Sequence, residues 1–185
     1  MAFMRRPRGL IDCGDLVLRR WRPQQDHPAA HALIEESLEH LRPWEAWVAA
    51  HSAEHTRRFL DHAESAWARG SAYNYGIVRG GALVGMCQSY RVERPDTTRI
   101  GYWLHPAATG RGIATRAAAA VADEMFALPG MEYVEIAHDL ANLASAAVPR
   151  RLGFSEVGHE RATPPLAPSG TGVEVIWRLP RPAPG

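Results

Sequence analysis

Two glycines near the middle of the chain stand where a phosphate-bearing ligand could bind. Gly110 and Gly112 follow a β-forming run that ends at Leu104 and Pro106, and a helix-forming, alanine-rich stretch (116–128) comes after them. A strand–turn–helix leaves unpaired N–H groups at the positive end of its helix. Glycines lack a β-carbon, so a ligand can approach the main chain closely. The turn therefore predicts a site for the pyrophosphate of a nucleotide-like cofactor.

The spacing of these glycines excludes two phosphate-binding loops. It matches neither the Gly-x-x-x-x-Gly-Lys of nucleotide-hydrolysing proteins nor the Gly-x-Gly-x-x-Gly of dinucleotide folds. The turn resembles instead motif A of the GCN5-related N-acetyltransferases (GNAT), written Gln/Arg-x-x-Gly-x-Gly/Ala. Gly112 and Ala114 match this motif. Thr109 stands where Gln or Arg is usual, and Arg111 could supply the missing positive charge.

A second segment resembles the same family more sharply. Residues 138–145 followed by 151–154 are similar to the Asn-x-x-Ser and Leu-Gly-Phe signature of one branch, which contains the ribosomal-protein N-terminal acetyltransferases (RimJ/RimL type). Residues 41–44 and 100–104 also resemble that branch. With the predicted order of elements, the resemblance covers roughly Leu16 to Leu179.

The resemblance implies where acetyl-CoA, the acyl donor of the family, would bind. The strands matching 99–104 and 133–138 splay apart in the family, and the pantetheine arm lies between them. This is physically sound, because an extended amide chain can add to a strand edge as a peptide does. The implied cofactor contacts are Trp103, Leu104, His105, Thr109, Gly110, Arg111, Gly112, Ile113, Ala114, Thr115, Asn142 and Ser145.

Asn142 and Ser145 each have an ordinary structural role as well as a functional one. Asn142 can cap a helix, and the resemblance adds a contact to the pantetheine arm. A serine inside a helix usually bonds back to a carbonyl or faces water. The resemblance implies instead that the Ser145 hydroxyl donates a proton to the leaving thiolate. Pro149 replaces the tyrosine acid of other members, and it removes the helix bond to the Ser145 carbonyl.

The sequence offers several candidates for the general base. Relatives often carry a glutamate just before the segment matching 100–104, but Arg99 stands there in this chain. His138 ends its predicted strand and titrates in the right range, so it is the candidate base. A structural or surface role competes with catalysis for His138 and for the alternatives, which are His105, Glu93 and Asp96.

Three aromatic residues are the candidates for binding the amine acceptor. Trp44 and Trp47 lie three apart beside a proline, where two exposed rings would be costly. They fit a buried helix–helix corner as well as the wall of a substrate cleft. Tyr90, at the end of a predicted strand, is the third candidate.

Composition limits the class of protein. The 185 residues are 46% hydrophobic and 22% charged, as expected of one globular domain, and the net charge of +1 gives no reason to expect nucleic acid or a membrane as partner. Two cysteines without metal or redox spacing fit reduced thiols in the cytoplasm. Histidines recur four apart at His27/His31 and His51/His55, but no third ligand follows, so a solvated helix face and no metal are predicted.

The elements that position these residues alternate between strands and helices. The predicted strands are 16–21, 73–78, 83–90, 99–104, 133–138, 155–161 and 173–179, and the predicted helices are 28–39 (capped by Asp26), 52–69, 116–128 and 142–152. Strand 133–138 should lie parallel to 99–104. The fold class is therefore α/β (α+β) of GNAT type: a mixed, mostly antiparallel sheet with a splayed parallel pair. Residues 1–14 are predicted to be a loose arm, 15–180 the domain and 181–185 a tail.

The sequence thus predicts an N-acetyltransferase that uses acetyl-CoA and a primary amine, either a protein N-terminus or a small molecule. Direct attack in a ternary complex is the expected route. Two alternatives stay open. One is another donor such as succinyl-CoA, and the other is a CoA-binding module without transfer activity, which Pro149 and Arg99 both allow. A homodimer is plausible from the family.

Overall fold

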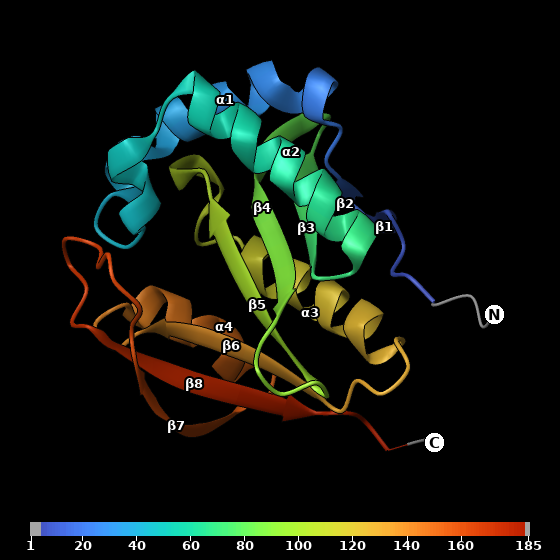
Figure 1. Cartoon of the computed structure of the whole chain (residues 1–185). Helices are drawn as coiled ribbons and strands as arrows, with labels where there is room; N and C mark the ends of the chain where they lie inside the picture. The colour runs from blue at the N-terminus through green and yellow to red at the C-terminus, as the bar shows by residue number, and fades with distance from the viewer. Residues whose placement is uncertain (1–4, 184–185) are drawn as a thin grey trace.

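The computed structural model describes residues 5–183, in which eight strands form one sheet in the order β1-β2-β3-β4-β5-β6-β8-β7 (Figure 1). The strands are β1 (Leu10–Asp12), β2 (Leu16–Arg20), β3 (Ala72–Arg79), β4 (Ala82–Arg91), β5 (Thr97–Leu104), β6 (Tyr133–Asp139), β7 (Ser155–Arg161) and β8 (Val173–Pro180). The helices are α1 (Pro23–Leu41), α2 (Ala53–Arg69), α3 (Ile113–Phe126) and α4 (Leu143–Arg151), with short 3-10 turns η1 (Ala46–Ala50) and η2 (Pro106–Ala108).

One pair of strands is parallel and the rest of the sheet is antiparallel. β5 pairs with β6 in parallel, as the crossover through α3 requires, and every other neighbouring pair runs antiparallel. This confirms the predicted fold class and the predicted parallel pair.

Helices cover both faces of the sheet. α3 and α4 contact β4, β5 and β6 on one face, and α1 and α2 contact β3 and β4 on the other (Figure 1). The larger core lies mainly against α3 and includes Ile100, Val121 and Ile136. A smaller cluster around Trp21 and Leu60 lies beneath α1 and α2. No helix within residues 5–183 has both the length and the apolar content that crossing a bilayer demands.

Capping explains where α2 begins and ends. The Ser52 side chain accepts a hydrogen bond from the His55 N–H, and Gly70 closes the helix in the left-handed conformation at φ 69°. The bounds of α2 agree with the predicted helix 52–69.

Two boundaries near the N-terminus differ from prediction. α1 begins at Pro23 rather than after Asp26, because proline fits the first helical position. Asp26 lies in the first turn, where it is buried and accepts hydrogen bonds from Arg19 and from the Arg22 N–H. The loose arm predicted for residues 1–14 does not hold for Leu10–Asp12, which pair with β2 and bury Ile11. Residues 1–4 lie outside the described residues.

The parallel pair opens part-way along its length. β5 and β6 are paired only from Thr97/Tyr133 to Ile100/Ile136. Beyond that point β5 stays paired with β4 as far as Leu104, while β6 stays paired with β8 as far as Asp139. The ends of the two strands therefore diverge, as Figure 1 shows, and the predicted splay is confirmed.

The diverging end of β5 depends on a glycine in β4. A β-carbon on Gly85 would lie 2.4 Å from the Trp103 carbonyl oxygen and 3.0 Å from the Leu104 α-carbon. Backbone atoms cannot move aside cheaply, so Gly85→Ala should destabilise the protein by about 1–3 kcal/mol. Urea unfolding measures this cost. The control is Gly101→Ala, whose β-carbon would lie 3.5 Å or more from its neighbours. Equal stability of the two variants would contradict the prediction.

Candidate active site

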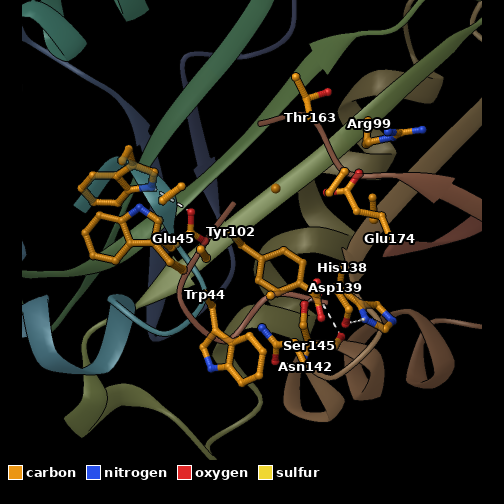
Figure 2. A pocket seen from close by; sticks show the side chains of 18 of the residues that line it. Trp44, Glu45, Arg99, Tyr102, His138, Asp139, Asn142, Ser145, Thr163 and Glu174 are labelled. Carbon is orange, nitrogen blue, oxygen red and sulfur yellow. Dashed lines mark hydrogen bonds between the residues drawn. The ribbon is translucent and has the colours of Figure 1, made fainter. Parts of the chain in front are cut away.

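A cavity of about 550 Å³ occupies the opening between β5 and β6 (Figure 2). Its size is typical of a small-molecule site. Gly101, Tyr102 and Trp103 line it from β5, and Ala137, His138 and Asp139 line it from β6. Asn142 and Ser145, at the start of α4, line the cavity as well.

Two loops border the opposite side of the cavity. Trp44, Glu45 and Trp47 come from the segment between α1 and α2, and residues 162–170 come from the loop between β7 and β8. The Ser169 N–H donates to the Pro43 carbonyl over 2.9 Å, so the two loops are joined. This tertiary contact holds the proline- and glycine-rich stretch beside the cavity.

Asn142 and Ser145 adopt the predicted local geometry. The Asn142 side chain accepts a hydrogen bond from the Ser145 N–H over 3.1 Å and so caps α4. Both side chains face the cavity, where Figure 2 shows them beside Tyr102. The capping role of Asn142 is confirmed, and its place in the cavity leaves it free to contact a ligand as well.

Tyr102 replaces the backbone donor that Pro149 lacks. Its hydroxyl donates to the Ser145 carbonyl over 3.1 Å, and it lies 3.2 Å from the Ser145 hydroxyl. Pro149 has no N–H, so in a regular helix this carbonyl would lack a partner. Burial raises the pKa of Tyr102 to about 12, so the hydroxyl keeps its proton at neutral pH. Sequence reasoning noticed the free carbonyl but missed Tyr102.

His138 lies at the cavity with both ring nitrogens in use. The Trp177 indole N–H donates to Nε2 over 2.9 Å, and Nδ1 lies 2.8 Å from the Asp139 carbonyl oxygen. An indole N–H can only donate and a carbonyl can only accept, so His138 is the neutral Nδ1–H tautomer. The lone pair that a general base needs is therefore occupied by Trp177.

Two carboxylates that the sequence analysis did not single out face the cavity. Burial raises the pKa of Glu174 on β8, and the nearby Glu160 carboxylate raises it further although Arg99 opposes this. Burial also raises the pKa of Glu45, whose Oε2 accepts from the Trp47 indole over 2.8 Å. Strand alternation could have found Glu174, because Val175 and Trp177 face the core and leave it on the opposite side.

Arg99 is committed to ion pairs inside the domain. Its Nη2 lies 2.9 Å from Glu135 and 3.2 Å from Glu160, and Arg178 binds the same Glu135 at 2.6 Å. Glu135 is buried and held by two arginines, so it is not available as a base. Figure 2 shows Arg99 close to Glu174 at one end of the cavity.

The glycine turn forms a second part of the site. Gly110 and Gly112 have φ values of 72° and 70°, and within residues 5–183 no further atom lies within 4 Å of a β-carbon placed on either. Gly112 gives α3 no side-chain cap, so the first N–H groups of the helix lack an acceptor within it. The turn thus exposes the donors that an anion would need.

Many of the predicted site residues line either the cavity or a smaller groove. The cavity is lined by Trp44, Trp47, Tyr90, Trp103, His138, Asn142 and Ser145. His105, Arg111 and Ile113 border a smaller groove beside α1, where His105 Nε2 lies 3.4 Å from Glu36. Glu93 and Asp96 do not line the cavity, and Asp96 is occupied by Thr97 and Arg94.

Comparison with known proteins places the chain in a family. Residues 15–155 match the acetyltransferase (GNAT) domain, so the chain belongs to the GNAT acetyltransferase family. It is 32% identical over 87 residues to the Bacillus subtilis (strain 168) protein named "Putative ribosomal N-acetyltransferase YdaF". That match spans 46% of this chain and 48%, about half, of the relative.

Solved structures share the fold over nearly the whole chain. The ribosomal L7/L12 alpha-N-protein acetyltransferase RimL in complex with coenzyme A has a TM-score of 0.84 at 24% identity, covering 92% of this chain and 97% of that one. Mycobacterium smegmatis RimJ in complex with CoA-disulfide has a TM-score of 0.78 at 24% identity, covering 89% and 81%. The microcin C7 self-immunity acetyltransferase MccE in complex with acetyl-CoA and AMP has a TM-score of 0.81 at 18% identity, covering 90% and 92%.

The contact between Tyr102 and the Ser145 carbonyl predicts an energetic coupling with Pro149. Tyr102→Phe should cost about 1–3 kcal/mol of stability, because it leaves a partly buried carbonyl unpaired. In a Pro149→Ala background the new backbone N–H can pair with that carbonyl, so the same change should cost less. Urea unfolding of the four proteins of this double-mutant cycle measures the difference. Costs that simply add would show that Tyr102 does not replace the missing donor.

Proposed function

We propose that this chain transfers the acetyl group of acetyl-CoA to a primary amine in a ternary complex. The observation that carries this proposal is the opening between β5 beyond Ile100 and β6 beyond Ile136, which leaves facing strand edges unpaired at a cavity. An extended pantetheine arm can pair with such edges as an added strand would. The glycine turn exposes N–H groups suited to the pyrophosphate, and Ser145 lies at the cavity to meet the thioester sulfur.

In this mechanism a neutral amine attacks the thioester carbon and the carbon–sulfur bond breaks. A base must first take a proton from the ammonium form, directly or through water. Glu174 fits this role better than His138, because its carboxylate faces the cavity and its pKa is raised by burial. A base with a raised pKa is closer to the operating pH and therefore more effective.

Ser145 is the proposed proton donor to the leaving sulfur. Tyr102 gives its single proton to the Ser145 carbonyl, so the Ser145 hydroxyl can rotate between the Tyr102 oxygen and a ligand. Its proton can then pass to the thiolate as the bond breaks, and the proton that the attacking nitrogen loses returns through water in the cleft to the Ser145 oxygen. Holding the amine and thioester together supplies much of the acceleration.

The charges around the cavity favour a cationic acceptor and a neutral acyl group. Glu45, Asp139 and Glu174 line the cavity, and Arg99, which lines it too, is paired with Glu135 and Glu160. Carboxylates attract an ammonium group as it approaches. A succinyl carboxylate would need a free basic side chain, so acetyl-CoA is favoured over succinyl-CoA. Several neighbours in structure are named as ribosomal-protein acetyltransferases, which makes a protein N-terminus one acceptor to test beside small amines.

Release of free CoA thiol from acetyl-CoA tests this function. The assay covers a panel of small amines and N-terminal peptides, with succinyl-CoA in parallel. Release that depends on one class of acceptor supports the transferase and identifies its substrate type. Tight binding of acetyl-CoA without acceptor-dependent release from either donor would indicate a CoA-binding module instead.

Two further features are proposed from the sequence and the family. A cytoplasmic location agrees with Cys13 and Cys87, both of which are free thiols. Formation of a homodimer stays a prediction.

Ser145→Ala should lower kcat by about 10²–10⁴-fold, the usual contribution of general acid catalysis. The dissociation constant of acetyl-CoA should change little, because the backbone of α4 and its Asn142 cap remain. Steady-state rates together with a direct titration of acetyl-CoA separate the two effects. An unchanged kcat would remove Ser145 from the mechanism.

The pH dependence of kcat/KM tests Glu174. A base acts when deprotonated, so the rate should rise with pH through the raised pKa of Glu174. Glu174→Gln should lower the rate by about 10²–10⁴-fold and abolish this acidic limb. Glu160→Gln should shift the limb to lower pH, since it removes a negative charge that raises this pKa. If the limb survives in Glu174→Gln and disappears in Glu45→Gln, Glu45 is the base.

A further inference from the structure

A cluster of imidazole and carboxylate groups lies outside the active site, between α1 and the end of η1. His31 and Glu35 are one turn apart on α1, and His51 follows η1 directly. The sequence suggested a solvated histidine face without a third ligand. The fold instead buries the His51 side chain to 3% exposure and places it over α1.

The three side chains converge on one point. The His51 Nε2 atom lies 2.9 Å from Glu35 Oε1, and His31 Nε2 lies 4.0 Å from the same oxygen. One ligand atom from each residue lies within 4.8 Å of the others. A tetrahedral zinc site with bonds of about 2.0–2.1 Å has its ligand atoms about 3.3 Å apart. The two observed distances to Glu35 Oε1, 2.9 and 4.0 Å, lie on either side of this spacing. The half-exposed Glu35 side chain can change its conformation to bring its oxygen to the required distance.

The surroundings of both imidazoles leave their Nε2 atoms facing the cluster. His51 Nε2 is buried and has no well-aligned hydrogen bond among the described residues, which is unusual for a buried polar atom. Thr56 donates its hydroxyl proton to the Ser52 carbonyl, and its oxygen lies 3.5 Å from His31 Nδ1. This contact favours the Nδ1–H tautomer of His31 and directs the Nε2 lone pair toward Glu35, as outer partners of metal-bound histidines do.

We propose that His31, Glu35 and His51 bind a zinc ion that joins α1 to the segment carrying Trp47. Two imidazoles and a carboxylate are a ligand set that zinc uses with water in the fourth position, whereas Mg²⁺ and Ca²⁺ prefer oxygen ligands alone. The ion fixes η1 against α1. Trp47 in η1 lines the active-site cavity, and its ring centroid lies 6.2 Å from that of Trp103. The metal therefore stabilises one wall of that cavity.

Zinc titration of the full chain, without a histidine tag and after treatment with a chelator, tests this site. A chromophoric competitor should report one zinc ion per chain, and Mg²⁺ should not compete. Glu35→Gln and His51→Gln should each weaken zinc binding by at least about 10-fold, since even outer partners of metal ligands are worth that much. The matched control is His62→Ala. His62 is an exposed histidine on α2, outside the cluster, so this variant should bind zinc as the wild type does.

Thermal unfolding gives a second measurement that does not depend on activity. Zinc should raise Tm of the wild type and of His62→Ala, but not of Glu35→Gln, whose half-exposed side chain can be replaced without disturbing the core. Zinc affinity that is equal in the wild type and in both ligand variants would overturn the proposal, as would absence of zinc binding by the wild type. Neither measurement involves acetyl-CoA, so the zinc site and the proposed transferase function are tested separately.

Discussion

β5 and β6 stop pairing beyond Ile100 and Ile136, and the arrangement of the candidate site depends on the opening that this leaves in the sheet. Each strand is held on its other side by a different antiparallel partner, β4 for β5 and β8 for β6, and the two partners lead them apart. An unpaired strand edge inside a domain is costly unless something binds it. The same feature that weakens the sheet therefore creates the place for an amide-bearing cofactor. The glycine turn follows β5 and the Asn142 cap of α4 follows β6. Each of the two diverging strands therefore leads into the start of a helix.

Pro149 shows how a missing group is compensated in this site. The proline removes a backbone donor, and Tyr102 from β5 reaches across the opening to the Ser145 carbonyl that is left without a helical partner. The contact joins the Tyr102 side chain of β5 to the backbone at the start of α4, the helix that follows β6. It also fixes the direction of the Tyr102 proton, which leaves the Ser145 hydroxyl free to serve a ligand.

Local signals in the sequence predicted most of the fold. Runs of β-forming and helix-forming residues located α2, β3, β4 and the parallel unit of β5, α3 and β6, because these signals are carried by neighbouring residues. The edge strand β1 was missed. Its three residues are too few to show a strand pattern in the sequence, and they form a strand only because they pair with β2. The start of α1 was misplaced because Asp26 resembles a cap in sequence but is drawn into the first turn by Arg19.

The candidate site was predicted in part for the same reason. Motif residues such as Asn142 and Ser145 were found because their spacing is local. Glu174, Tyr102 and the loop over residues 162–170 were not, because they reach the cavity only through strand order and contacts between distant segments. The lone pair of His138 is occupied by Trp177, 39 residues further along the chain, and no local pattern reveals that partner.

Amide hydrogen exchange with and without acetyl-CoA tests the central claim most directly, namely that the cofactor occupies the opening between β5 and β6. Bound acetyl-CoA should slow exchange in residues 101–104, 110–115 and 137–139, and leave the β2–β3 pairing at the far side of the sheet unchanged. Protection that appears elsewhere, with no change in these three segments under saturating acetyl-CoA, would contradict the account.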